Sequence, residues 1–107
     1  MAQARPELVE FLLSELDGMD ALTARRFFGG WQILSAGRQF AIVMKGTLFF
    51  RVGGLLRDEM AALGCPPFSY TKHGAEVSVS KYMSAPEELF DDPDLLIHWV
   101  QRVLSAA

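Results

Sequence analysis

The residues of this chain that could perform chemistry are few, and none stands in a pattern typical of an active site. The soft metal ligands are Cys65, His73 and His98, and no CxxC or HxxxH spacing joins them. A metal site needs several ligands at structured spacings. Cys65 stands beside two prolines with no histidine near it in sequence, which favours a small packed residue over an activated thiol. We therefore predict no metal, no cofactor and no catalytic residue.

Carboxylates gather in one stretch toward the C-terminus, and paired carboxylates are the usual tools of general acid and base catalysis. They are Glu87, Glu88, Asp91, Asp92 and Asp94. Each falls at the cap or in the first turn of a predicted helix, where negative charge is stabilising by ~0.3–1 kcal/mol without any function. We interpret this run as helix capping and solvated surface.

Two glycines in "RVGGLLRDEM", residues 51–60, lie between a predicted strand and a predicted helix, which is the order of a phosphate-binding loop. The flanking lysine or third glycine of such loops is missing. Glycine's tolerance of positive φ is enough to explain the pair as a turn, and we interpret it so.

Arginines and aromatic residues make the strongest remaining candidate, centred on "RRFFGGWQIL" at residues 25–34. Such a surface could stack bases or bind a partner protein. Side chains alternate between faces in a strand, so at least half of the aromatics must face the core, and we expect Phe27 or Phe28 to do so. The arginines then need a role. The candidate interaction residues are Arg25, Arg26, Arg38 and Arg51.

Length and charge bound the classes of protein that could present these residues. A chain of 107 residues, half of them hydrophobic, predicts one domain over residues 1–107. Residues 1–53 carry six Lys or Arg and five Asp or Glu, whereas residues 54–107 carry four and eight. The acidic second half argues against wrapping DNA through a broad basic surface. A small basic patch remains open.

Hydropathy and cysteine content predict the compartment. The apolar stretches "FAIVM" and "LFFRV" are far shorter than the ~20 residues needed to cross a bilayer. The N-terminal "MAQARPELVEF" has an acidic residue where a signal peptide needs its apolar run. A lone cysteine agrees with a reducing environment. We expect a cytoplasmic protein with no membrane contact.

Periodicity in the first half predicts one helix followed by a meander. Leu8, Phe11, Leu12 and Leu16 fall at helical spacing within a helix over residues 6–17. Three strands rich in β-branched and aromatic residues follow, separated by glycine-containing turns, with an extended lead-in at residues 23–28. The three strands are expected at residues 31–34, 38–44 and 47–52.

The second half predicts a helix over residues 53–64, a hairpin, and a closing helical region. In the hairpin, Val77 and Val79 alternate with serines, as one buried and one wet face require. Pro86 begins a short helix, and Asp92 caps the last one. The predicted fold is α+β in two layers, an antiparallel sheet with helices on one face, in the order α-β-β-β-α-β-β-α.

Four stretches together resemble the N-terminal domain of the TfoX/Sxy family over roughly residues 19–104. They are "RRFFGGWQILSAGRQFAIVMKGTLFFRV", "LGCPPFSY", "VSVSKYMSAPEEL" and "DPDLLIHWVQRVL". The resemblance assigns structural motif positions and implies a secretion-chaperone-like fold of the TfoX N-terminal type. The motif positions are Phe28, Gly29, Gly30, Trp31, Gly37, Phe40, Phe68, Tyr70, Tyr82, Pro86 and Trp99.

The resemblance also implies a function. The family is named for regulators of bacterial competence genes, which act as co-activators beside a DNA-binding transcription factor, and no enzymatic activity is attributed to the domain. We therefore expect a non-enzymatic regulatory or protein-interaction domain whose partner belongs to the transcription machinery or is itself a regulator. Full-length members carry a second, helical domain, and we expect this chain to be the N-terminal domain alone.

Two other classes of function stay open. Direct nucleic-acid binding through the arginine and aromatic patch is the alternative, and a small-ligand site or enzyme in a cleft between sheet and helices is the least favoured. An exposed edge strand could also pair two copies into a homodimer.

Overall fold

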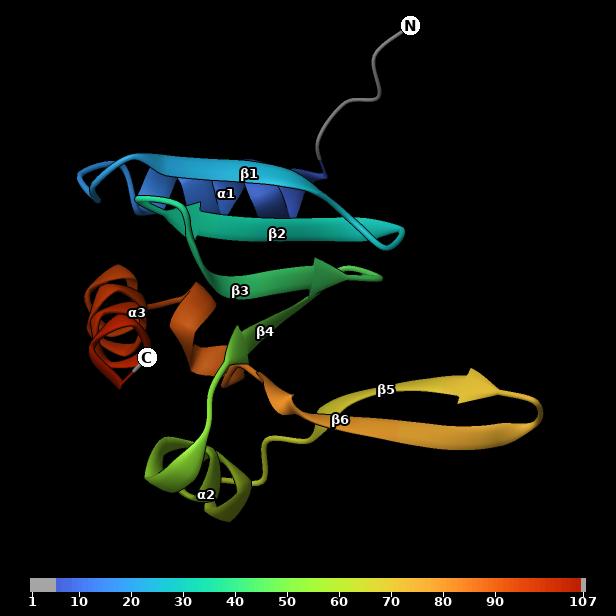
Figure 1. Ribbon diagram of the computed structural model, residues 1–107. Helices are drawn as coiled ribbons and strands as arrows, with labels where there is room; N and C mark the ends of the chain where they lie inside the picture. Colours follow the sequence, from blue (N-terminus) through green and yellow to red (C-terminus); the bar gives the residue numbers. More distant parts are fainter. Residues whose placement is uncertain (1–5, 107) are drawn as a thin grey trace, which may run out of the picture.

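Residues 6–106 contain one antiparallel sheet of six strands in the order β1-β2-β3-β4-β6-β5. The computed structural model describes residues 6–106 (Figure 1). The strands are β1 Leu22–Phe27, β2 Gly30–Ser35, β3 Arg38–Met44, β4 Thr47–Arg51, β5 Pro67–Lys72 and β6 Ala75–Ser84. The helices are α1 Glu7–Glu15, α2 Gly54–Ala62, the 3-10 helix η1 Glu87–Phe90 and α3 Pro93–Ala106. The predicted α+β class is confirmed.

The meander has four strands instead of the predicted three. The segment expected only as an extended lead-in is a full strand, β1, which pairs with β2 from Leu22 opposite Ser35 to Phe27 opposite Gly30. Its sequence, "LTARRF", lacks the apolar run that marks the central strands. β1 is an edge strand, and charged side chains on an edge discourage pairing with other chains. Its polar composition therefore hid it from sequence analysis.

Four two-residue loops join neighbouring strands, and each has the type I′ form that matches the right-handed twist of a hairpin. In every loop φ lies between 44° and 52° at the first residue and between 77° and 81° at the second, which is glycine each time. The loops are Phe28-Gly29, Ala36-Gly37, Lys45-Gly46 and His73-Gly74. The predicted corner at residues 25–34 is thus a hairpin with Phe28 at its tip.

The four helices within residues 6–106 all pack on one face of the sheet, as predicted. Leu12 of α1, Met60 of α2, Leu89 of η1 and Val100 of α3 belong to the same buried cluster. The sheet contributes a second set of buried residues to this cluster, which we call the main core. Those from the central strands are Ile33, Phe40, Ala41, Val43, Leu48 and Phe50. Burial of each large apolar side chain contributes ~1.5–3 kcal/mol, so the main core holds the helices to the sheet.

The predicted helix cap at Asp92 and the predicted short helix after Pro86 are both present. The Leu95 N–H donates to the Asp92 carboxylate over 3.2 Å at the start of α3, so Asp92 is the predicted cap. The short helix after Pro86 is the 3-10 helix η1. Within residues 6–106, no helix has the length and apolar character that a membrane span requires.

A bidentate ion pair ties α2 to α3. The Arg102 guanidinium donates to both carboxylate oxygens of Glu59 over 2.7 Å each and lies 4.7 Å from the centre of the Trp99 ring. The hydrogen bonds from Arg102 hold the pKa of Glu59 below its ordinary value of 4.5. A carboxylate whose pKa is lower in the folded state than in the unfolded state stabilises the fold at pH values above its unfolded-state pKa. This contribution is lost as the pH falls through the folded-state pKa.

We therefore expect the difference in unfolding free energy between wild type and Glu59→Gln to shrink as the pH falls below 4.5. Urea unfolding followed by circular dichroism at neutral and acidic pH measures this difference. Asp58→Asn is the control. Asp58 is the neighbour of Glu59 on α2, and its carboxylate lies 3.9 Å from Arg57 Nε without a bidentate bond. A gap that is the same at every pH would contradict the role assigned to the Glu59 carboxylate.

Candidate interaction surface

The face of the sheet opposite the helices carries a second, smaller apolar cluster. Ile42, Phe49 and Tyr82 are its buried members, and Phe27, Met44, Phe68 and Val79 pack against them. Among residues 6–106, every member of this cluster comes from a strand. Figure 1 shows α1 behind β1 and β2, on the far side from the viewer. We call this second side of the sheet the open face.

A β-bulge in β3 decides which side chains reach the open face. Ile33 of β2 pairs with Ala41, but the next residue, Leu34, pairs with Gln39, which leaves Phe40 extra in β3. Phe40 and Ala41 can then both face the main core, where both are buried. Bulges re-aim side chains in this way. As a result Gln39 and Ile42, three positions apart, both lie on the open face.

The β5–β6 hairpin leaves the sheet and projects as an arm. Pro67 pairs with Met83, but the next residue, Phe68, pairs with Val79, so residues 80–82 of β6 have no partner in β5. Proline has no N–H to donate to the ladder, which explains the break at this point. Beyond it the two strands pair only with each other, and Figure 1 shows them extending away from the other strands. We call residues 68–79 the arm.

One side of the arm is apolar and faces away from the main core. Phe68 lies opposite Val79 and Tyr70 opposite Val77, whereas Ser69 and Ser78 pair on the other side. The alternation predicted from sequence is therefore present. The burial expected for the valines is only partial, because no helix within residues 6–106 packs against the arm, and Tyr70 remains 43% exposed.

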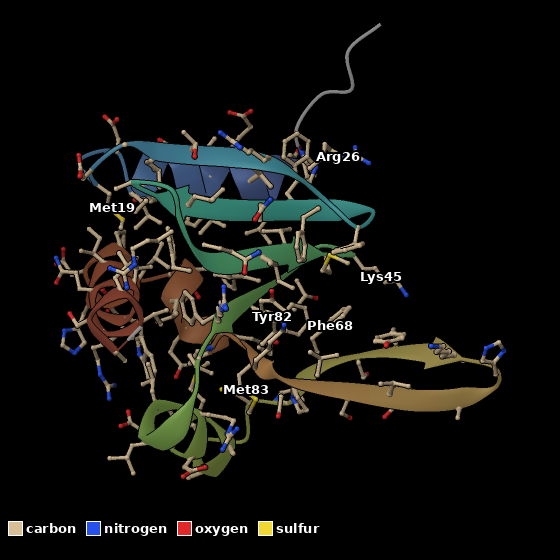
Figure 2. The ribbon with its side chains drawn as sticks, in the orientation of Figure 1. Met19, Arg26, Lys45, Phe68, Tyr82 and Met83 are labelled. Atoms are coloured by element: carbon tan, nitrogen blue, oxygen red, sulfur yellow. The ribbon has the colours of Figure 1, made fainter. Side chains whose placement is uncertain are left out.

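An apolar groove of about 460 Å³ lies where the arm meets the sheet. Its floor is built from aromatic contacts, since the Phe49 and Phe68 rings meet edge to face at 5.3 Å and Phe27 meets Tyr82 at 6.4 Å. Figure 2 shows Phe68 and Tyr82 near the point where the arm leaves the sheet. The groove is lined by Phe27, Phe28, Ile42, Met44, Phe68, Tyr70, Val79, Lys81 and Tyr82.

A larger cleft of about 1070 Å³ adjoins the groove. It forms where the pairing of β3 with β4 ends, at Ala41 and Phe50, and Val103 and Ala106 of α3 also line it. Cationic and amide side chains line it together with Tyr82, and we call it the basic cleft. Its polar lining residues are Gln32, Arg38, Gln39, Arg51, Lys81 and Tyr82. Among residues 6–106, no Asp or Glu lines it.

The cations of the basic cleft are held differently. The Arg38 guanidinium donates to the Leu104 carbonyl over 2.9 Å, near the C-terminal end of α3, where positive charge is favoured. The Lys81 ammonium lies 5.5 Å from the centre of the Tyr82 ring. Arg51 is exposed at the end of β4. Arg38 therefore forms a wall of the cleft, while Arg51 and Lys81 face solvent.

A chain of hydrogen bonds crosses the sheet beneath the basic cleft. The Tyr82 hydroxyl donates to Gln39 Oε1 over 2.9 Å, and Gln39 Nε2 donates to Gln32 Oε1 over 3.0 Å. These bonds orient the two amides and connect β6 to β3 and β2, which are not neighbours of β6 in the sheet.

Tyr82→Phe is expected to lower the free energy of unfolding by ~0.5–1.5 kcal/mol, because it removes the donor to the Gln39 carbonyl in a partly buried site. Urea unfolding measures the loss. Tyr70→Phe deletes the same hydroxyl on the exposed arm and should change stability by less than ~0.5 kcal/mol. Equal effects of the two substitutions would show that the hydrogen-bond chain contributes nothing.

The structure brings together two of the four arginines named from sequence. Arg38 and Arg51 both line the basic cleft. Arg25 pairs with Gln32 and shares its face, but lines neither hollow. Arg26 pairs with Trp31 and places its guanidinium 5.5 Å from the centre of the indole. Figure 2 shows Arg26 beside β1, well away from Tyr82.

Sequence reasoning missed Lys81, Gln32 and Gln39 as parts of the surface. The bulge at Phe40 orients Gln39 toward Tyr82, and no local sequence pattern predicts this bulge. Lys81 follows the alternating "VSVS" stretch, and that alternation was the one available signal that the hairpin would present a distinct face.

The aromatic motif positions differ in burial and in the face of the sheet on which they lie. The expectation that Phe27 or Phe28 enters the main core was wrong, since Phe27 packs on the open face and Phe28 is 87% exposed. The reason is the type I′ turn, which puts Phe28 at the hairpin tip, where its ring meets Phe27 edge to face at 4.8 Å. Trp31 packs partly against the main core. Buried motif residues are Gly30, Phe40, Tyr82, Pro86 and Trp99.

The cysteine and histidines are placed apart. Partial burial raises the pKa of the Cys65 thiol, and the Glu88 charge adds to the effect, which is the opposite of what activates a nucleophile. His73 lies at the tip of the arm and His98 on the exposed side of α3. Within residues 6–106, no group of three or more His, Cys, Asp or Glu could hold a metal ion.

Comparison with known proteins assigns the chain to a family. The family model described as the TfoX N-terminal domain matches residues 14–107, which is nearly the whole chain. No curated protein matches it in sequence. The matched span begins within α1 and includes strands β1 to β6, the arm, the apolar groove and the basic cleft.

Proposed function

This chain belongs to the TfoX N-terminal domain family, and from that premise we propose that it is a non-enzymatic regulatory domain that acts by protein contact. The contact surface is formed by the apolar groove and the arm on the open face, together with the adjoining basic cleft, which extends to α3. The partner is a component or regulator of the transcription machinery, as the resemblance to competence regulators implies, and the contact takes place in the cytoplasm.

The exposed apolar surface of the open face carries this proposal. Phe28 is 87% exposed and Tyr70 43% exposed, and both line the groove. Contiguous apolar patches on a protein surface mark interaction sites more often than single exposed residues do. A two-stranded hairpin is also marginally stable in water without further packing. A partner on the open face would cover the apolar side of the arm and stabilise it.

Site-specific photocrosslinking tests the proposal. Benzoylphenylalanine placed at position 28 in cells should crosslink to a discrete protein partner. The control position is Leu55 on α2, which is also 87% exposed but lies outside both hollows. A shared set of products from both positions, or none from position 28, would contradict docking on the open face. Identification of the partner by mass spectrometry as a metabolic enzyme would contradict the regulatory role.

Direct nucleic-acid binding is a second candidate, favoured by one observation. The exposed Phe28 ring lies at the rim of a cleft that contains Arg38, Arg51 and Lys81, and aromatic rings beside cations are typical of single-strand binding. Such binding would weaken steeply with salt, because each phosphate contact releases counterions. A gel shift at low salt that is lost at high salt supports this candidate, and no shift at micromolar protein removes it.

A further inference from the structure

We propose that the partner segment bound by the open face is an acidic, apolar peptide. Its carboxylates lie against Arg51 and Lys81 in the basic cleft, and a neighbouring aromatic or large aliphatic side chain fills the apolar groove beside Phe68. This inference rests on the proposed function, because it names the chemistry of the partner that docks there.

The two hollows form one continuous surface. They share four lining residues, which are Phe27, Phe28, Lys81 and Tyr82. The groove volume of about 460 Å³ lies within the ~300–1,000 Å³ typical of ligand clefts, and the basic cleft, at about 1070 Å³, slightly exceeds the upper end of that range. A single extended segment therefore reaches both hollows, with side chains of different character in each.

Charge selects the acidic part of the segment. The chain has a net charge of −3, yet no Asp or Glu within residues 6–106 lines the basic cleft. Within the same residues, no carboxylate forms an ion pair with Arg51 or Lys81. An incoming carboxylate would form charge-assisted hydrogen bonds with these cations, while the acidic remainder of the molecule repels other approaches.

Apolar contact selects the apolar part of the partner segment. Ile42, Phe68 and Val79 line the groove, and the apolar side of the arm continues from it through Tyr70 and Val77. Large apolar side chains bury the most surface in such a groove and supply most of the binding energy, whereas charges at the rim supply orientation and specificity. An uncharged apolar peptide would lack the orientation, and a purely acidic one would lack the affinity.

Two other occupants fit the surface less well. A nucleic acid is a polyanion along its length. Arg25 shares a face with Gln32 but lines neither hollow, and Arg26 lies over Trp31, so neither adds to the cations that line the cleft. A second copy bound through the same face would bring two basic clefts into one interface, because a two-fold contact pairs a surface with itself, and like charges oppose this.

Fluorescence anisotropy with designed peptides tests the inference. The probe is a short fluorescein-labelled peptide in which glutamates alternate with phenylalanines and glycines, and the comparison peptides carry glutamine for glutamate or serine for phenylalanine. We expect the acidic, apolar peptide to bind about tenfold more tightly than either comparison peptide at low salt. The advantage over the glutamine peptide should shrink as salt screens the charges.

Matched variants locate the contacts. Arg51→Gln and Lys81→Gln should each weaken the acidic peptide by about two- to fivefold, with no effect on the glutamine peptide. Arg57→Gln makes the same change on α2, outside both hollows, and should bind as wild type. Tyr70→Ser should weaken both phenylalanine-containing peptides. Circular dichroism confirms that each exposed substitution leaves the fold intact.

Several results would overturn the inference. Equal binding of the acidic and glutamine peptides, or no binding of either, removes the acidic partner, while crosslinking at position 28 still decides the proposed function independently. Tighter binding of a labelled single-stranded oligothymidine, with a steeper salt dependence and loss in Arg51→Gln, assigns the surface to nucleic acid. A concentration-dependent dimer that excludes the peptide and is lost in Phe28→Asp assigns it to a second copy.

Discussion

Phe50→Ala is expected to lower the free energy of unfolding by ~3–5 kcal/mol. Phe50 has no exposed surface and lies on the central strand β4, where Ala41 and Met83 flank it across the sheet. Removal of the ring loses its burial and leaves a cavity that the two neighbouring strands cannot close without breaking their pairing. A domain of this size is stabilised by only ~5–15 kcal/mol, so the loss is a large share of the total.

Urea unfolding followed by far-ultraviolet circular dichroism measures the loss. Phe28→Ala is the matched control, because it deletes the same ring at an exposed hairpin tip and should change stability by less than ~0.5 kcal/mol. A comparable loss in both variants would mean that the open face, and not the main core, holds the sheet together.

Gly30→Ala is expected to destabilise the fold by ~1–3 kcal/mol or more. A Cβ at Gly30 would overlap the Val43 carbonyl oxygen and the Met44 sulfur, both at separations under 3.0 Å. The methionine can move, but the Val43 carbonyl belongs to β3, whose residue Val43 pairs with Trp31 of β2. Relief of the overlap therefore requires the β2–β3 ladder to separate at its end.

Gly29→Ala tests whether the two glycines have different roles. Gly29 has φ +81° with open space around its Cβ position, so alanine there costs only the ~1–2 kcal/mol of left-handed backbone. Urea unfolding of both variants, with the ladder followed by amide hydrogen exchange of β2 and β3, separates the effects. We expect loss of protection in β2 and β3 only for Gly30→Ala. Intact protection in both variants would contradict the steric role of Gly30.

The local elements of the fold were largely predictable from sequence. Helix periodicity placed α1 and α3, and Asp92 was correctly expected to cap α3. Runs of β-branched and aromatic residues placed β2, β3 and β4, because those strands are buried against the helices and carry the strongest apolar signal. β1 escaped as a complete strand because an edge strand needs little apolar character and this one carries two arginines.

The candidate site was predictable only in part. Arg38 and Arg51 were named for their neighbourhood in sequence, and both line the basic cleft. Arg26 was named on the same grounds, yet it lies over Trp31, since consecutive residues of a strand point to opposite faces. Lys81 comes from a strand thirty residues after Arg51 and joins it only because β6 pairs with β4.

Residue types and spacing were enough to establish the α+β class, the antiparallel hairpins and the family, because these depend on local propensity and on an ordered set of motifs. The bulge at Phe40, the departure of the arm and the convergence of Arg51 with Lys81 were decided by tertiary structure. The alternation at Val77 and Val79 shows the reason. A local pattern predicts that one face of a strand is apolar, but long-range packing decides which element covers that face. Within residues 6–106, no helix covers the apolar side of the arm.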